Sequence, residues 1–239
     1  MAGIHWVRSA PMPSLPRSLL SAVVAAGLVL AACGGGGDDV GDDRADQVRS
    51  SAKEAGLPDD VADLLALAAR GDGATFQVSY AGTEGARLVV SQAPPDRRVD
   101  VLDGDVMVES RVLHDQVAYR CEPDTRDGAK PGALSCRRAA GALDAAGTFT
   151  ADALTSFTDQ LASSRTTLTV KVDARTIAGV RARCLTSTPK AGTPIDGTGP
   201  GTDVLCLSPE GAQLLVDRSG DRLVADHYST KVPKGTFDV

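Results

Sequence analysis

The residues that could take part in chemistry are few and widely spaced along this 239-residue chain. His114 and His227 both lie among polar residues, and no nucleophile or carboxylate partner can be assigned to either one. The chain has no Gly-x-Ser-x-Gly elbow, no His-Glu-x-x-His motif and no phosphate-binding glycine loop. We therefore expect two ordinary surface histidines and predict no enzymatic activity, no cofactor and no metal site.

Cys33 is the residue whose surroundings predict a covalent modification. It follows the apolar run 19–30 and two alanines, and Arg8 and Arg17 precede that run. A positive segment, a short apolar segment and small residues before a cleavage site are typical of a secretory signal. The run is shorter than the roughly 20 residues of a membrane-spanning helix.

The four residues Leu30-Ala31-Ala32-Cys33 resemble the bacterial lipobox, whose cysteine receives a diacylglycerol before cleavage. The resemblance implies a signal peptide over residues 1–32 and a lipid anchor on Cys33. Buried acyl chains would hold the protein on the extracytoplasmic face of the cell membrane. The alternative is an ordinary signal peptide cut near Ala32, which would leave a free thiol.

The other four cysteines predict two disulfides, because their number is even and the chain is expected to be exported. Three connectivities are possible. We favour Cys121–Cys136 and Cys184–Cys206, since each pair lies in strand-like runs on either side of a loop. A zinc site is the alternative, but the chain has no Cys-x-x-Cys spacing to support it.

Charge and composition limit the classes of partner. Removal of residues 1–32 takes away two arginines and no acidic residue, so the formal net charge falls from −6 to −8. Nucleic acid is therefore not an expected partner, because phosphate binding needs clustered Lys and Arg. Arg97-Arg98 and Arg137-Arg138 could contact anionic head groups, although solvated strand edges are the commoner role of such pairs. Aromatic residues make up only 3% of the chain, so Val, Leu and Ala must form most of the core.

The pattern along the chain predicts a tether followed by one domain. Residues 33–43, which include Gly34–Gly37, are too polar to bury a core and predict a flexible tether. Residues 44–239 then form a single domain. Helices are expected over 43–55, closed by Gly56, over 58–70, and from an N-cap at Thr150.

The remaining segments predict strands separated by turns, with turns at Asp103-Gly104, at His114-Asp115 and at Ser219-Gly220. The expected strands are 75–80, 86–92, 97–102, 105–112, 116–121, 133–138, 167–172, 179–187, 203–208, 212–218 and 221–229. Helices before and between two strand meanders favour an α+β fold, mostly antiparallel sheet with helices on one face.

Over roughly residues 57–239 this organisation resembles the lipoprotein carriers typified by LolA, LolB and the mycobacterial LppX group. The resemblance rests on the opening strand 75–80, on the mid-chain helix between two meanders, and on the segments 117–121, 179–184 and 203–206. These segments also resemble uncharacterised actinobacterial lipoproteins. The resemblance implies a half-open, mostly antiparallel β-barrel whose concave apolar face is covered by helices and receives acyl chains.

Two strands with alternating apolar residues are the candidate ligand-binding face. Phe76, Val78 and Tyr80 lie on one, and Leu168, Val170 and Val172 lie on the other. We expect all six to project to the same side of a curved sheet. Two functions remain open: a monomeric carrier of a lipid or other hydrophobic ligand, or a non-enzymatic scaffold or accessory domain for a cell-envelope protein with the same fold and a closed core.

Overall fold

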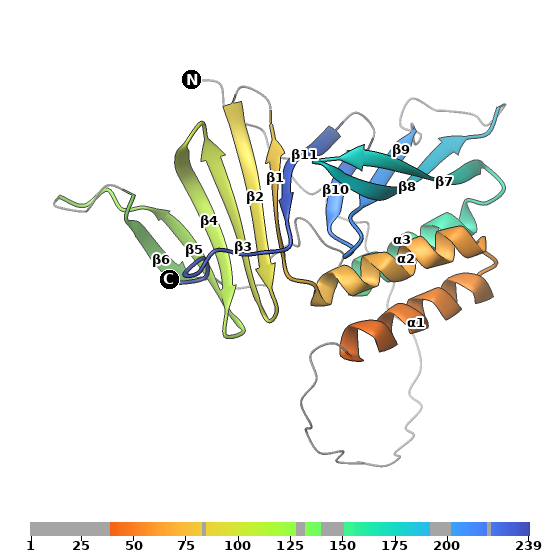
Figure 1. Cartoon of the computed structure of the whole chain (residues 1–239), viewed down its shortest axis with the longest axis horizontal. Helices are drawn as coiled ribbons and strands as arrows, with labels where there is room; N and C mark the ends of the chain where they lie inside the picture. The colour runs from red at the N-terminus through yellow and green to blue at the C-terminus, as the bar shows by residue number, and fades with distance from the viewer. Residues whose placement is uncertain (1–38, 83–84, 128–131, 140–150, 192–201, 219–220) are drawn as a thin grey trace, which may run out of the picture. The chain divides into compact units, whose positions relative to one another are not determined.

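The computed structural model describes residues 39–82, 85–127, 132–139, 151–191, 202–218 and 221–239 (Figure 1). All of them belong to one compact unit, residues 36–239. The predicted signal peptide, Cys33, Gly34–Gly37, Thr150 and the turn at Ser219-Gly220 lie outside the described residues. Within the described ranges, no helix combines the length and the apolar character needed to span a membrane.

Helix α2, Asp59–Arg70, is the most deeply buried helix that the structure describes. The predicted stripe of Val61, Leu64, Leu65 and Ala68 is confirmed, and each of these side chains is at most 1% exposed. The helix follows Pro58, begins with two aspartates that favour the positive end of the helix dipole, and ends before Gly71. A short 3-10 helix η1, Gly71–Gly73, leads from α2 towards the sheet.

Helix α1, Asp39–Glu54, begins earlier than predicted. The predicted tether, residues 33–43, is therefore wrong over its last five positions, which are helical. Aspartates are favourable at a helix N-terminus, and Asp42 pairs with Arg70 of α2 at 3.1 Å. The predicted C-terminal glycine is confirmed: Gly56 has φ +76°, and its N–H donates to the Lys53 carbonyl as in a Schellman motif.

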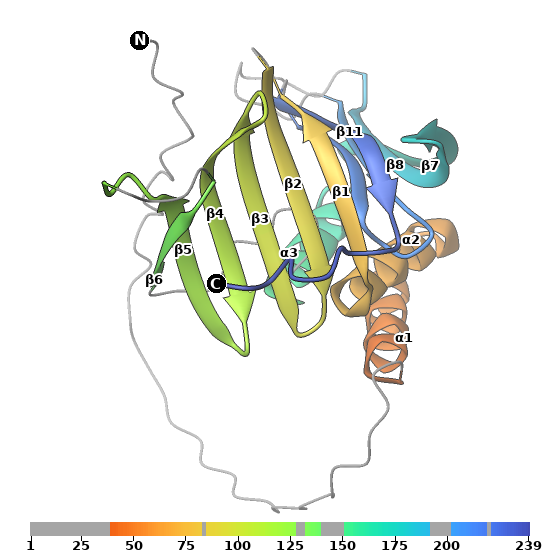
Figure 2. The same ribbon diagram turned by 60° about the vertical axis from the view of Figure 1, so that its left-hand side comes forward.

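The described strands form one eleven-stranded antiparallel sheet, in the order β6-β5-β4-β3-β2-β1-β11-β10-β9-β8-β7. The first meander extends from β1 to β6, and its strands lie side by side in this order (Figure 2). Helix α3, Ala151–Ser163, precedes the second meander, β7 to β11. Pairing of β1 with β11 joins the two meanders. The strands are β1 (Phe76–Ala81), β2 (Ala86–Ala93), β3 (Asp96–Asp103), β4 (Val106–His114), β5 (Val117–Pro123), β6 (Leu134–Arg138), β7 (Leu168–Ile177), β8 (Val180–Pro189), β9 (Asp203–Leu207), β10 (Gln213–Arg218) and β11 (Asp221–Ser229).

Two predicted turns lie one residue too early. Asp103 pairs with Val106, so the β3–β4 turn consists of residues 104–105 and not Asp103-Gly104. His114 pairs with Val117 and ends β4, so the β4–β5 turn consists of residues 115–116 and not His114-Asp115. Asp115 and Gln116 both have positive φ, at +48° and +64°, as a two-residue hairpin of this kind requires.

Both predicted disulfides are present. Cys121 and Cys136 lie directly opposite each other on β5 and β6, and Cys184 and Cys206 do so on β8 and β9. Each bridge therefore joins neighbouring strands across the loop that connects them.

The sheet is curved but open. β7 contacts β11 although three strands separate them in the sheet order, so the second meander curls (Figure 1). β6 and β7 each have only one neighbour in the sheet, so the barrel is not closed. Helix α2 contacts β7, β8 and β9, which places the helices against this part of the sheet.

Two apolar cores form on opposite sides of β8 and β9. The helix core joins α1, α2 and α3 to Leu185, Leu205 and Leu207. The second core contains the intervening side chains Cys184 and Cys206, together with apolar residues of β1, β2, β10 and β11. Since successive side chains of a strand point to opposite faces, β8 and β9 are covered on both sides.

Candidate functional sites

The β1 half of the predicted ligand face is completely buried. Phe76 and Val78 are 0% exposed and Tyr80 is 2% exposed, and all three belong to the second core. The Tyr80 hydroxyl donates a hydrogen bond to the Gln213 carbonyl at 2.5 Å. Burial raises the pKa of Tyr80 above that of an ordinary tyrosine. This triad has the composition and the packing of a closed protein interior.

The β7 half lies in a different environment. Leu168, Val170 and Val172 are half-buried, and Val170 and Val172 pack against the helix core. Val172 lies opposite Leu185, which is one of the buried side chains of that core. The alternation within β7 is thus as predicted, with its apolar side directed to the helices.

The structure does not bring the two triads together into one binding face. They belong to separate cores, and the strands β11, β10, β9 and β8 lie between β1 and β7 in the sheet. Six apolar residues that pack against the helix core are only partly buried, and four of them are large side chains on α3 and on the sheet. We call these four the seam residues: Phe157 of α3, Val170 and Val172 of β7, and Val216 of β10.

A polar hollow of about 240 Å³ lies at the other end of the sheet, beside β5 and β6. Its charged side chains are paired with one another. Arg120 and Arg137 both contact Glu122, at 3.3 and 3.5 Å, and Arg126 contacts Asp124 at 2.6 Å. The side-chain hydrogen bond from Arg126 lowers the pKa of Asp124 to about 2. The hollow has three arginines against two carboxylates, and Arg120 also contacts Glu109 at 3.2 Å. Because every charged side chain is paired, the hollow offers no concentrated charge to a ligand.

The paired arginines of β3 are not the solvated edge residues that the sequence predicts. The side chains of Arg97 and Arg98 are each only 11% exposed. Arg97 contacts Asp72 at 3.3 Å and also Gln92, and burial lowers the Arg97 pKa. Arg98 contacts Asp100 at 2.7 Å and donates to the Thr236 carbonyl at 2.8 Å. These two arginines hold η1 and the C-terminal segment against the sheet.

Gln92 is a buried polar residue whose role the sequence did not indicate. Its side-chain amide nitrogen lies 2.7 to 3.0 Å from the carbonyl oxygens of Gly71, Asp72 and Ala74. The two hydrogens of this amide are shared among carbonyl groups of η1 and of the residue that follows it, and they hold the segment that leads into β1. No local pattern in the sequence could have revealed this role, because the partners are about 20 residues away.

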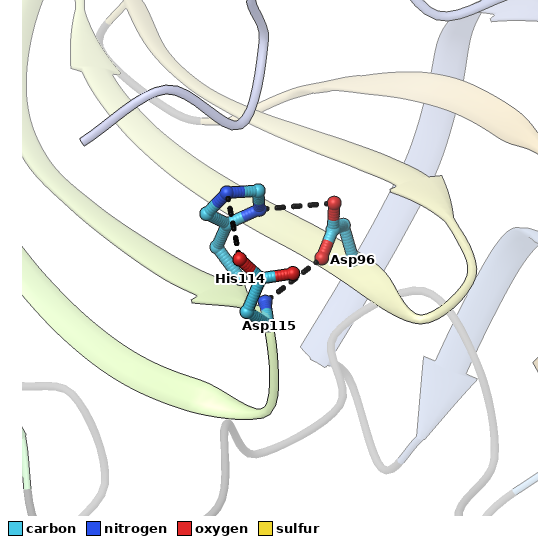
Figure 3. Close-up of side chains that lie close together, drawn as sticks. All are labelled: Asp96, His114 and Asp115. Atoms are coloured by element: carbon cyan, nitrogen blue, oxygen red, sulfur yellow. Dashed lines mark hydrogen bonds and ion pairs between the residues drawn. The ribbon is translucent and has the colours of Figure 1, made fainter.

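His114 lies between two carboxylates (Figure 3). Its Nδ1 is 3.0 Å from an oxygen of Asp96, and its Nε2 is 3.6 Å from an oxygen of Asp115. The hydrogen bond with Asp96 raises the pKa of His114, and the negative charges of Asp96, Asp115 and Asp238 act in the same direction. His227, by contrast, is exposed on β11.

This arrangement around His114 does not fit nucleophilic catalysis, since a catalytic base needs one ring nitrogen directed at a hydroxyl or thiol. Here both ring nitrogens face carboxylates. Asp96, His114 and Asp115 are also a set of side chains that can ligate a metal ion. The sequence predicts no metal site, because 18 residues separate Asp96 from His114 and only the sheet brings them together.

In comparisons with known proteins, no family model matches the chain, and no curated protein matches it.

Proposed function

We propose that the protein is a membrane-anchored extracytoplasmic lipoprotein that binds or carries a lipid or other hydrophobic ligand, without enzymatic activity. The lipobox-like sequence before Cys33 supports the anchor. The open antiparallel sheet with helices against one part of it supports a half-barrel of the LolA and LppX type. On this proposal the protein works beside the membrane that holds it.

The observation that carries the proposal is the partial exposure of the seam residues. Most of the helix core is closed, yet Phe157, Val170, Val172 and Val216 remain half-buried where the helices meet the sheet. Apolar side chains in this position gain free energy when an acyl chain covers their exposed area, at ~25 cal/mol per Å². The seam therefore replaces the six-residue face as the proposed ligand site. Phe76 and Val78 have no exposed area to offer, and Tyr80 is only 2% exposed.

A second candidate function is a scaffold or accessory domain for a cell-envelope protein. The complete burial of Phe76, Val78 and Tyr80 favours it, because a closed interior needs no ligand. The two candidates share the anchor and the fold. They differ in whether the seam accepts a ligand.

The test is ligand uptake by the delipidated protein with Val170→Phe. A phenyl ring at a half-buried position should fill the seam and lower affinity for a fluorescent fatty acid at least tenfold, with little change in melting temperature. Thr169→Phe is the matched control, because Thr169 is exposed on the same strand and points to the opposite face. It should bind the probe like the unaltered protein.

Two outcomes would favour the scaffold. One is a delipidated protein that binds no fatty acid or phospholipid and carries none in native mass spectrometry. The other is a Val170→Phe variant that melts well below the unaltered protein, since overpacking a closed core costs ~1–3 kcal/mol. For a domain of this size each kcal/mol lowers the melting temperature by ~2–4 °C.

The anchor has a separate test. Cys33→Ala should abolish incorporation of an acyl probe and should yield unprocessed or shed protein, because both the acylation and the lipoprotein cleavage depend on that thiol. Detergent partitioning of labelled membranes measures both effects. Acyl label on the Cys33→Ala protein would contradict the assignment.

A further inference from the structure

Two turns at the same end of the first meander bring the ligand-type side chains together. Asp96 begins β3 just after the β2–β3 turn, His114 ends β4, and Asp115 lies in the β4–β5 turn. In an antiparallel meander every second turn lies at the same end of the strands, so the β2–β3 and β4–β5 turns are neighbours. Figure 3 shows the three side chains converging from these strand ends.

We propose that Asp96, His114 and Asp115 bind a divalent metal ion of the zinc type. One imidazole nitrogen and two carboxylate oxygens form a mixed ligand set of the kind that zinc accepts, and water can complete its coordination. Calcium and magnesium prefer oxygen ligands alone, which makes them poorer candidates here. The site lies on β3 to β5, away from the seam residues, and is independent of the proposed lipid binding.

The distances suit this proposal. One ligand atom from each of the three residues lies within 4.8 Å of the others. Ligands bound at ~2.1 Å in a tetrahedral arrangement lie about 3.4 Å apart, so the ligands must approach one another slightly. An ion can use only one ring nitrogen, so the carboxylate that faces the other nitrogen must shift towards the ion. Asp115 can make this movement, because its side chain is 85% exposed.

Asp96 is already held in place. One of its oxygens is 3.0 Å from His114 Nδ1, and the other accepts a hydrogen bond from the Asp115 backbone N–H at 3.2 Å. A carboxylate oriented in this way by an outer hydrogen bond is typical of metal ligands. The Asp96 and His114 side chains are 20% and 35% exposed, so an ion would reach the site from solvent.

The local charge also favours a dication. The charged groups that act on His114 are the carboxylates of Asp96 and Asp115 and that of Asp238 in the C-terminal segment. A divalent ion would supply two positive charges against these three negative ones. A bound ion would in addition link the β2–β3 turn to the β4–β5 turn.

The test is zinc binding by the mature, chelator-treated protein. Calorimetry measures the binding of Zn²⁺, and visible absorption measures the binding of Co²⁺ as a substitute. We expect one equivalent of Zn²⁺ and a melting temperature that rises with added Zn²⁺. Asp115→Asn should weaken binding at least tenfold and abolish that rise. Asparagine tolerates the positive φ of position 115, so this variant should keep the turn.

His114→Gln is the second variant and should also lose binding, while His227→Gln is the matched control for adventitious binding by an exposed histidine. Three results would overturn the proposal. The first is failure of the unaltered protein to take up one equivalent of Zn²⁺ or Co²⁺. The second is binding that persists in both His114→Gln and Asp115→Asn, and the third is loss of binding in His227→Gln.

Discussion

Strands β1 and β7 carry the same alternation of apolar and polar residues, yet their apolar sides are buried to different depths. β1 lies inside the sheet between β2 and β11, and its triad is completely buried. β7 is an edge strand with β8 as its only neighbour, and its triad is half-buried. Alternation therefore predicts which side of a strand is apolar, while the place of the strand in the sheet determines how much of that side is covered.

The difference in burial between β1 and β7 has a functional consequence. Side chains inside the sheet stabilise the fold, whereas those at the edge keep area that a ligand could cover. This is why the proposed ligand site lies at the seam residues and not on β1. Substitutions that pair one residue from each region test the distinction directly.

The largest expected difference is between Phe76→Ala and Phe157→Ala. Phe76 is fully buried in β1, so its truncation should lower the free energy of unfolding by ~3–5 kcal/mol. Phe157 is half-buried on α3, so the same change should cost less than half as much. Urea unfolding of the purified protein measures both values. Equal losses would mean that the seam is as closed as the second core.

Much of the fold could be predicted from the sequence because its signals are local. The stripe on α2, the glycine at the end of α1 and the alternation of β1 and β7 each depend on spacing within a few residues. The disulfide pairs could be predicted too, since each links strands that are consecutive along the chain.

The rest depends on contacts that no local pattern encodes. The separation of the two triads follows from the β1–β11 pairing, which joins residues about 150 positions apart. Arg97 and Arg98 look like edge residues in sequence, but Asp72 and Thr236 reach them from distant segments. The His114 cluster likewise depends on where the β4–β5 turn begins, and the turn predicted from the sequence lies one residue too early.

A smaller difference is expected between the two disulfides. In the chain-entropy model, closing loops of 15 and 22 residues contributes about 3.0 and about 3.4 kcal/mol, so loop length hardly separates them. Burial separates the two disulfides, because Cys184 and Cys206 are both 0% exposed whereas Cys136 is half-buried at the edge of the sheet.

Replacing Cys184 and Cys206 by alanine should therefore destabilise the protein more than replacing Cys121 and Cys136. The excess should be about 1 kcal/mol, measured as a difference in unfolding free energy between the two double variants. A larger loss of stability for the β5–β6 pair would contradict the view that burial of the cysteines, and not loop length, distinguishes the two disulfides.

The smallest expected difference is between Tyr80 of β1 and Tyr228 of β11. Tyr80 is buried and donates to the Gln213 carbonyl, so Tyr80→Phe should cost about 1 kcal/mol at neutral pH by leaving that carbonyl unpaired. Tyr228 is half-buried, and its hydroxyl bonds Glu210 and Ser208. Burial is the main cause that raises the pKa of both tyrosines, and for Tyr228 the hydrogen bond to Glu210 adds to it.

The direction of the pH effect follows from these raised pKa values. Below pH ~10 the tyrosine is protonated in both the folded and the unfolded chain, so its contribution to stability is complete. Above pH ~10 the unfolded chain loses the proton while folded Tyr80 keeps it, so stability falls by up to ~1.4 kcal/mol per pH unit. Tyr80→Phe should remove that part of the alkaline loss, and Tyr228→Phe should remove less of it because Tyr228 is less buried. Urea unfolding at pH 9 and pH 11 measures the difference, and an unchanged loss in Tyr80→Phe would show that β1 is not sealed from water.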